Sequence, residues 1–320
     1  ASTMAECVAL VRAAEKSKAM YMLCENYPYM IFNQELRKIV QGGTLGDILY
    51  AEGEYNHPSN PENVDFVRLC YDRSAEKHWR LYLPRTYYIT HSMAPLMLAT
   101  GKMPKRVTAL PVAPFTDFSQ VERRASHVKE TAAIITTMNE DGSVYRVTGH
   151  SNFGVEVNSY RFCGRRGQVE NLRGDESMIS LNYNPWEIPE GGQQSAFYKA
   201  VCDEKYTEQV KNVGHCGGDF FVIKEFIEHI QKGEKHTMDE YFATTLSAVA
   251  ILGHRSLLEG GMPYDIPDFR NEEDRKKYEN DNLSPFYYSD GREPSIPCTY
   301  DRDYKPTEAQ VEAWKKWVFE

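Results

Sequence analysis

Two tight turns between strand-like runs constrain the fold of this 320-residue chain more than any other feature. Residues 131–152 are predicted to form a hairpin around Asn-Glu-Asp-Gly at 139–142, and residues 160–170 a second one around Gly-Arg-Arg-Gly at 164–167. Tight turns join antiparallel strands, whereas parallel strands need long crossovers. The pattern therefore predicts a mainly antiparallel sheet, an α+β fold.

Helix signals flank these hairpins. Thr3 and Glu6 form a capping box that predicts a helix through about Ser17. The apolar residues Ile223, Phe226, Ile227 and Ile230 recur at helical spacing after Asp219. The other predicted elements are helices at 32–41, 239–259 and 308–317, and strands at 47–57 and 106–112.

The segment Ala19–Cys24 is a continuous apolar run, which is typical of a buried parallel strand. Together with the preceding helix it resembles the closing unit of a doubly wound sheet. Nothing before it can form the rest of such a sheet. After Pro267 the composition shifts to charged and aromatic residues with several prolines, which predicts an extended arm over the domain or a neighbour.

Composition excludes some classes of protein. The net charge of −9 argues against nucleic acid as a partner, because phosphate binding needs clustered Lys and Arg. No apolar run reaches the roughly 18 residues of a membrane span. The seven cysteines are odd in number and never spaced Cys-x-x-Cys, so we expect neither a disulfide framework nor a zinc site, and a cytoplasmic location.

The segment Tyr87–Pro95 places a histidine and two tyrosines at the start of a predicted helix. Imidazole and phenol can move a proton on and off a sugar or polyol hydroxyl near neutral pH. A histidine near a helix start is often a satisfied structural residue, and that alternative applies to His91.

The order of several short motifs resembles the Gfo/Idh/MocA family of oxidoreductases over the chain as far as about Asp268. The motifs are Thr-Met-Ala-Glu at 3–6, Glu-Asn-Tyr at 25–27, Gly-Gly-Thr-Leu-Gly-Asp at 42–47, Ala-Glu-Gly-Glu-Tyr at 51–55, Tyr-Ile-Thr-His at 88–91 and Gly-His-Cys-Gly-Gly-Asp at 214–219.

The resemblance implies an arrangement of domains. Residues 1–26 would be the last helix and strand of a truncated Rossmann domain, 27–268 a substrate and oligomerisation domain with a large open sheet and helices on one face, and 269–320 a C-terminal extension. The sequence has no Gly-x-Gly-x-x-Gly turn and no Glu-Lys-Pro segment, both common in the family. We expect a family member without most of its cofactor domain, through truncation, a split gene or an incomplete sequence.

The resemblance aligns His91 with the histidine that ends an Asp-x-x-x-His element in many family dehydrogenases. Tyr87 stands at the acidic position here. A carboxylate would raise the basicity of the imidazole and fix its tautomer, so its loss argues against a simple His/Asp dehydrogenase. Tyr-Ile-Thr-His is similar instead to the branch of NAD-dependent glycosidases and sugar 3-oxidising enzymes. The resemblance therefore implies that His91 and Tyr88 are catalytic.

The remaining candidates each have a structural alternative. Glu25 and Asn26 are interpreted as cofactor-binding beside the nicotinamide, and Tyr27 as substrate-binding, although the three also fit a plain strand-to-loop turn.

His215 lies just before a predicted helix, whose N-terminus would attract a substrate oxygen, so His215 is interpreted as substrate-binding. The structural alternative is a turn that the neighbouring glycines produce. Trp79 and Arg80 can stack on and hydrogen-bond a sugar, although a buried Trp with a surface Arg is the commoner case. No Asp/Glu/His cluster in the sequence indicates a catalytic metal.

These observations lead to three hypotheses. The first is the substrate-binding and catalytic portion of an oxidoreductase that uses NAD or NADP on a carbohydrate or glycoside hydroxyl. The second is an NAD-dependent glycosidase that works by transient oxidation at C3 and elimination. The third is a non-catalytic sugar-binding or assembly subunit. In each case we expect a homo-oligomer formed through the open sheet.

Overall fold

The computed structural model describes residues 1–58, 77–113, 126–149, 151 and 153–319. The described residues form one nine-stranded sheet with the order β8-β7-β6-β5-β1-β4-β3-β2-β9. The strands are β1 (Ile48–Asn56), β2 (Pro104–Val112), β3 (Ala132–Asn139), β4 (Val144–Thr148), β5 (Val157–Gly164), β6 (Gly167–Leu172), β7 (Asp175–Tyr183), β8 (Ser195–Lys199) and β9 (Tyr264–Asp265).

The pairing confirms the mainly antiparallel sheet. β3 and β4 form the first predicted hairpin, and β5 and β6 form the second. The central pair, β1 with β4, is parallel, and every other pair of neighbouring strands is antiparallel. β7 and β8 extend the sheet beyond the strands predicted from the sequence.

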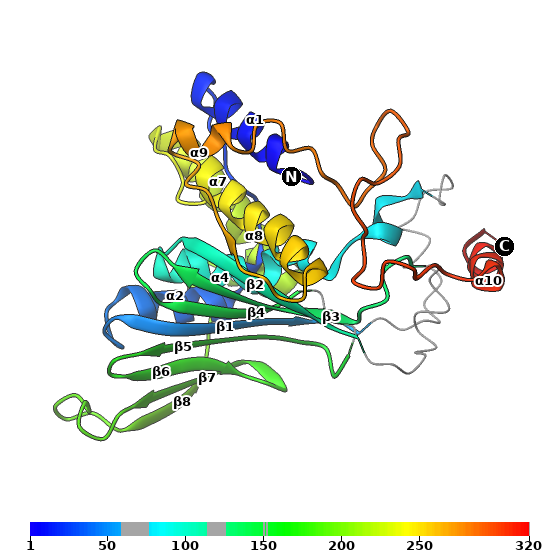
Figure 1. Ribbon diagram of the computed structural model, residues 1–320. Coiled ribbons are helices and arrows are strands. Elements are labelled where there is room, and N and C mark those ends of the chain that lie inside the picture. Colours follow the sequence, from blue (N-terminus) through cyan, green and yellow to red (C-terminus); the bar gives the residue numbers. More distant parts are fainter. Residues whose placement is uncertain (59–76, 114–125, 150, 152, 320) are drawn as a thin grey trace.

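Most of the helices gather on one side of this sheet, whereas α10 lies apart from them at the right of Figure 1. α4 packs on β1, α8 packs on β2, and α1 packs on α8, while α7 contacts the turn Tyr27–Tyr29. The helices are α1 (Met4–Lys16), α2 (Ile31–Gln41), α4 (Thr90–Thr100), α6 (Thr207–Val210), α7 (Gly218–Lys232), α8 (Glu240–Leu258), α9 (Glu272–Lys276) and α10 (Glu308–Phe319). The predicted capping box is present: Thr3 accepts from the Glu6 amide, and Glu6 accepts from the Thr3 amide.

The predicted strand at Ala19–Cys24 is not formed. This segment forms no strand, and its Leu23 amide donates to the carbonyl of Met238 in the loop before α8. A parallel strand is stabilised by ladders to neighbouring strands, and the described residues place none beside it. The segment instead connects α1 to the turn Tyr27–Tyr29 without regular secondary structure.

The C-terminal residues fold back on the domain, as predicted for an extended arm. Phe269 belongs to the main core, and Cys298 and Trp314 pack with Leu81 and Tyr82 in a second cluster. The cysteines in the described part of the chain are all free. Among the described residues, no helix combines the length and the apolarity needed to cross a bilayer.

A buried histidine in α8 makes stability depend on pH. His254 is fully buried and donates from Nε2 to the Pro297 carbonyl at 2.7 Å. Burial lowers the pKa of His254 from 6.5 to about 4. Because the pKa of the folded state is the lower one, the stabilisation is present above pH 6.5 and is lost as pH falls toward 4.

We therefore expect His254 to contribute about 3 kcal/mol to the loss of stability between pH 7 and pH 4. Urea unfolding at both pH values measures the change, in the wild type and in His254→Gln, whose side chain does not titrate. The variant should lose about 3 kcal/mol less than the wild type over this range. An equal loss in both proteins would contradict this assignment.

Candidate functional site

The first turn of α4 places His91 beside the C-terminal end of β1. β1 and α4 approach closely at Gly53, where a Cβ atom would lie 1.9 Å from the Ser92 carbonyl oxygen. The Tyr160 hydroxyl donates to the His91 carbonyl at 2.6 Å and ties the same turn to β5. The position of His91 therefore depends on a glycine in the neighbouring strand.

A carboxylate from a distant part of the chain is the partner of His91. Glu25 Oε1 lies 2.6 Å from His91 Nδ1, and the Glu25 side chain is 7% exposed. Tyr87, which stands where the family motif has an acidic residue, is structural: its hydroxyl donates to the Ser2 carbonyl at 3.1 Å. Glu25 thus takes the place of the acidic residue that the motif lacks. The sequence had instead predicted a cofactor-binding role for Glu25.

The second ring nitrogen of His91 faces a phenol. Tyr88 Oη lies 3.2 Å from His91 Nε2. Because the Glu25 carboxylate can only accept, the uncharged ring carries its proton on Nδ1 and has a lone pair on Nε2. This arrangement is that of an oriented general base with a hydroxyl at its reactive nitrogen.

Two further tyrosines form the walls around His91. The Tyr27 ring stacks on the imidazole at 3.7 Å between centroids, and the Tyr55 ring meets its edge at 4.8 Å. Burial raises the pKa of both phenols, so both are uncharged at neutral pH. The sequence reasoning missed Tyr55 as a site residue, although it ends the Ala-Glu-Gly-Glu-Tyr motif and points inward with Ala51 and Gly53.

A second histidine–carboxylate pair approaches from the start of α7. His215 donates from Nδ1 to Asp219 at 3.0 Å, and its ring lies 5.7 Å from that of Tyr27. Asn26 Nδ2 donates to Asp219 Oδ1 at 2.5 Å. Burial raises the pKa of the Asp219 carboxyl, but the hydrogen bonds from Asn26 and His215 outweigh it and bring that pKa below its ordinary value.

The loop that carries His215 has an unusual backbone. His215 and the next residue, Cys216, both have positive φ, at 53° and 48°. Such conformations cost energy for residues with a Cβ atom and are concentrated at functional sites. At Gly218 a Cβ atom would lie 2.6 Å from the Asn26 carbonyl oxygen, so this glycine lets the loop approach the segment that carries Glu25.

One predicted pair lies apart from this cluster. Trp79 is 45% exposed, and the Arg80 guanidinium lies 4.7 Å from its ring centroid. Within the described residues, no hydrogen bond or ring contact joins either side chain to His91, Tyr27 or Asp219. The structure therefore brings together Glu25, Asn26, Tyr27, Tyr88, His91 and His215 of the predicted residues, and leaves the role of Trp79 and Arg80 a prediction.

Residues 180–276 match the family model described as the glycosyl hydrolase 109 C-terminal domain. The chain is also 23% identical over 302 residues to glycosyl hydrolase family 109 protein 1 of Phocaeicola vulgatus, covering 84% of this chain and 62% of that protein. It is 23% identical over 296 residues to glycosyl hydrolase family 109 protein 2 of Akkermansia muciniphila, with 84% and 61% covered. The chain thus spans about three fifths of the length of these relatives.

The predicted resemblance to Gfo/Idh/MocA oxidoreductases is confirmed at the level of the fold. An oxidoreductase domain protein from Kribbella flavida superposes with a TM-score of 0.65 at 17% identity, covering 83% of this chain and 72% of that one. Levoglucosan dehydrogenase in complex with NADH and L-sorbose superposes with a TM-score of 0.64 at 14% identity, with 84% and 71% covered.

The residues predicted to bind a nicotinamide cofactor have other hydrogen-bond partners in this structure. The Glu25 side chain is hydrogen bonded to His91, and the Asn26 side chain donates to Asp219. Gly42 and Gly43 lie at the C-terminal end of α2, where helix carbonyls and not amides are exposed. The described residues therefore form no binding site for a pyrophosphate. We assign no reaction step of the cofactor to them.

One group of side chains among the described residues is close to the arrangement of a metal site. Glu225, His229 and His236 have ligand atoms within 4.8 Å of one another. The Met238 amide, however, donates to His236 Nδ1 at 2.8 Å, so the uncharged ring carries its proton on Nε2, 2.8 Å from the Tyr29 hydroxyl. A metal needs a lone pair on that nitrogen. We therefore assign a hydrogen-bonding role to His236 and its neighbours. The absence of a catalytic metal stays a prediction.

Proposed function

We propose that this chain is the substrate-binding and proton-transfer portion of an enzyme that acts on a carbohydrate or glycoside hydroxyl with NAD or NADP. The observation that carries the proposal is the hydrogen-bonded line from Glu25 through His91 to Tyr88, with separations of 2.6 and 3.2 Å. A buried carboxylate behind an imidazole, with a phenol in front of it, is suited to removing a proton from a hydroxyl group.

The proton path follows from this geometry. A sugar hydroxyl gives its proton to the Tyr88 oxygen as Tyr88 gives its own proton to Nε2 of His91, so that one O–H bond breaks and one N–H bond forms. The imidazolium that results is stabilised by the Glu25 carboxylate. Tyr27 and Tyr55 cover the ring and exclude water. A nicotinamide cofactor would supply the hydride acceptor, and the proposal assigns no described residue to its pyrophosphate.

The opposite pair, His215 and Asp219, is proposed to orient the sugar. The His215 side chain is 47% exposed and is held by Asp219, so it can reach a ligand with a fixed ring. Its ring lies near Tyr27, which stacks on His91, so a sugar that contacts His215 also lies close to the base. Two polar groups with an aromatic face between them are suited to a pyranose ring.

The comparisons favour net hydrolysis as the second candidate outcome. The matched family and the relatives carry the name glycosyl hydrolase, whereas solved neighbours are dehydrogenases and oxidoreductases. In both outcomes the first proton is taken from a sugar hydroxyl by the same residues. Oxidation leaves reduced cofactor behind, and hydrolysis leaves the redox state unchanged.

The test incubates the 320-residue chain with NAD⁺ and a panel of methyl and 4-nitrophenyl glycosides, and follows NADH and the released aglycone in the same sample. NADH that accumulates with glycoside consumption supports oxidation. Aglycone release without NADH accumulation supports hydrolysis. Either reaction should be lost in His91→Asn. If the chain neither turns over a glycoside nor binds a nicotinamide, the proposal fails in favour of a non-catalytic sugar-binding or assembly subunit.

The face of the sheet opposite the helices supports the proposed homo-oligomer. In Figure 1 no described helix covers this face. It carries a cross-strand network in which Arg146 and Arg161 lie 3.0 and 3.1 Å from Glu52, with Glu54 paired to Arg173 at 2.9 Å. Paired charges on a broad open sheet suit a self-complementary interface, and light scattering of the purified chain measures the assembly.

A further inference from the structure

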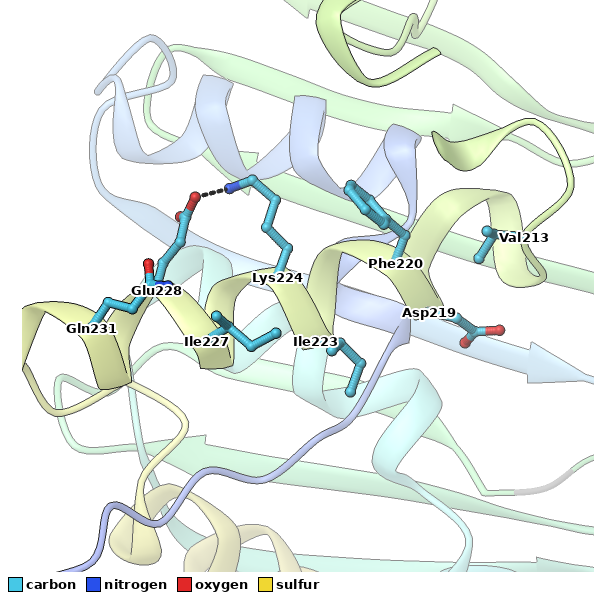
Figure 2. Close-up of a pocket in the computed structure, with 8 residues that line it drawn as sticks. All are labelled: Val213, Asp219, Phe220, Ile223, Lys224, Ile227, Glu228 and Gln231. Atoms are coloured by element: carbon cyan, nitrogen blue, oxygen red, sulfur yellow. Dashed lines mark ion pairs between the residues drawn. The ribbon is translucent and has the colours of Figure 1, made fainter. Parts of the chain in front are cut away.

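The outer face of α7 carries a groove that the proton-transfer residues do not use. Its volume is about 600 Å³, and Phe220, Ile223 and Ile227 line it from successive turns of the helix (Figure 2). Asp219 and Gln231 are the first and the last residue of α7 that line it. The two positions are twelve steps apart along the helix, which corresponds to a length of roughly 18 Å.

Two of the apolar side chains in this groove are exposed to water, while Phe220 is half-buried against the core. Ile223 and Ile227 are 49% and 47% exposed, whereas Phe221 and Val222 on the opposite face of the helix are buried. The repeat that predicted α7 from the sequence therefore marks a surface stripe, continued by Ile230 at 51% exposure. A contiguous apolar surface of this kind on a domain that has its own core usually marks a binding site.

The groove is continuous with the candidate site through one side chain. Asp219 lines the groove and also accepts hydrogen bonds from Asn26 and His215. The His215 ring neighbours Tyr27, and Tyr27 stacks on His91. A molecule with its polar end at these histidines can therefore lay an attached chain along α7.

The charged residues that line the groove in the described part of the chain, Asp219, Lys224 and Glu228, are all paired. Lys224 Nζ lies 2.7 Å from Glu228 Oε1, in an i,i+4 pair that Figure 2 shows above the apolar side chains. The volume is in the range of small-molecule sites, about 300–1,000 Å³. These features favour an uncharged apolar chain of small-molecule size as the occupant.

We propose that this groove binds the apolar aglycone of the substrate, so that the chain acts on amphiphilic glycosides with an alkyl or aryl tail. This inference rests on the proposed function, because it places the sugar at His91 and His215. The Phe220–Ile227 stripe then contributes to substrate affinity and to the choice of substrate, without contacting the reacting atoms.

Calorimetric titration of the intact chain tests the inference. Matched methyl and octyl glycosides of glucose, galactose and mannose are compared below the micelle concentration of the octyl compounds. The octyl form of the sugar that binds should bind about tenfold tighter or more, since the added methylenes leave water. Ile227→Asn should remove most of this gain and leave methyl glycoside binding unchanged. Ile223→Asn serves as the second variant, and thermal unfolding verifies that each variant folds.

A matched control lies outside the groove. Leu49 in β1 is 50% exposed, and Leu49→Asn should change neither affinity. Equal affinities for methyl and octyl glycosides would overturn the aglycone site and leave the sugar site intact. If no glycoside of either kind binds, the proposed function fails, and this inference fails with it. Octyl sulfobetaine that binds as tightly as the octyl glycoside would also overturn the inference, because the groove would then act without the sugar.

Discussion

Replacing Glu25 with glutamine is expected to lower glycoside turnover by about 10²- to 10⁴-fold while the chain stays folded. The glutamine amide can donate to Nδ1 of His91, which moves the ring proton to Nε2. A protonated Nε2 cannot accept the proton that Tyr88 passes on, and the imidazolium also loses its neighbouring carboxylate. The measurement is kcat/KM for the glycoside that is turned over, in the wild type and in the variant.

A second histidine–glutamate pair provides the control for this variant. His57 Nδ1 lies 3.1 Å from Glu156 Oε1, and the Glu156 side chain is 67% exposed. Glu156→Gln removes the same kind of charge from the same kind of pair, on a histidine that stacks on Tyr55 and not on His91. It should leave turnover within about twofold of the wild type, as is usual for exposed pairs. Equal losses in both variants, or none in Glu25→Gln, would contradict the assigned role of Glu25.

Replacing Gly53 with alanine is expected to destabilise the chain by about 3 kcal/mol or more and to displace His91. The new Cβ atom would meet the Ser92 carbonyl oxygen at 1.9 Å, and that oxygen belongs to the helix backbone, which cannot rotate away. β1 and α4 would have to separate, although both lie at the centre of the core. Thermal and urea unfolding measure the loss.

Gly253 in α8 provides a matched substitution. A Cβ atom there would meet Val107 Cγ2 at 3.5 Å, an ordinary contact distance. Since alanine is the better helix former by about 1 kcal/mol, Gly253→Ala should leave stability unchanged or raise it. A Gly53→Ala variant as stable as Gly253→Ala would show that α4 is not held against β1 as described, and that the position of His91 has another cause.

Local signals in the sequence were sufficient for much of the fold. Thr3 and Glu6 form the capping box that their spacing predicts, and the glycine-containing turns form hairpins, because these features depend on residues a few positions apart. The family motifs likewise predicted the open sheet and the helical layer.

Features that depend on distant residues were harder to predict. The partner of His91 comes from Glu25, 66 positions away, and no local pattern marks that pairing. The apolar run at Ala19–Cys24 looks like a buried strand, yet a strand needs neighbours that only the tertiary structure can supply. The spacing of Ile223 and Ile227 correctly indicated a helix but not which side of it would face solvent. β8 alternates between exposed and half-buried residues, so its sequence carries little hydrophobic signal.

The tautomer of His91 tests the central claim most directly. Nitrogen-15 NMR of the histidine side chains, with His91 assigned by comparison with His91→Asn, shows which ring nitrogen carries the proton when the ring is uncharged. The geometry predicts a proton on Nδ1 in the wild type, hydrogen bonded to Glu25, and a move to Nε2 in Glu25→Gln. A wild-type ring with its proton on Nε2, or a His91 signal that the Glu25 substitution leaves unchanged, would contradict the account.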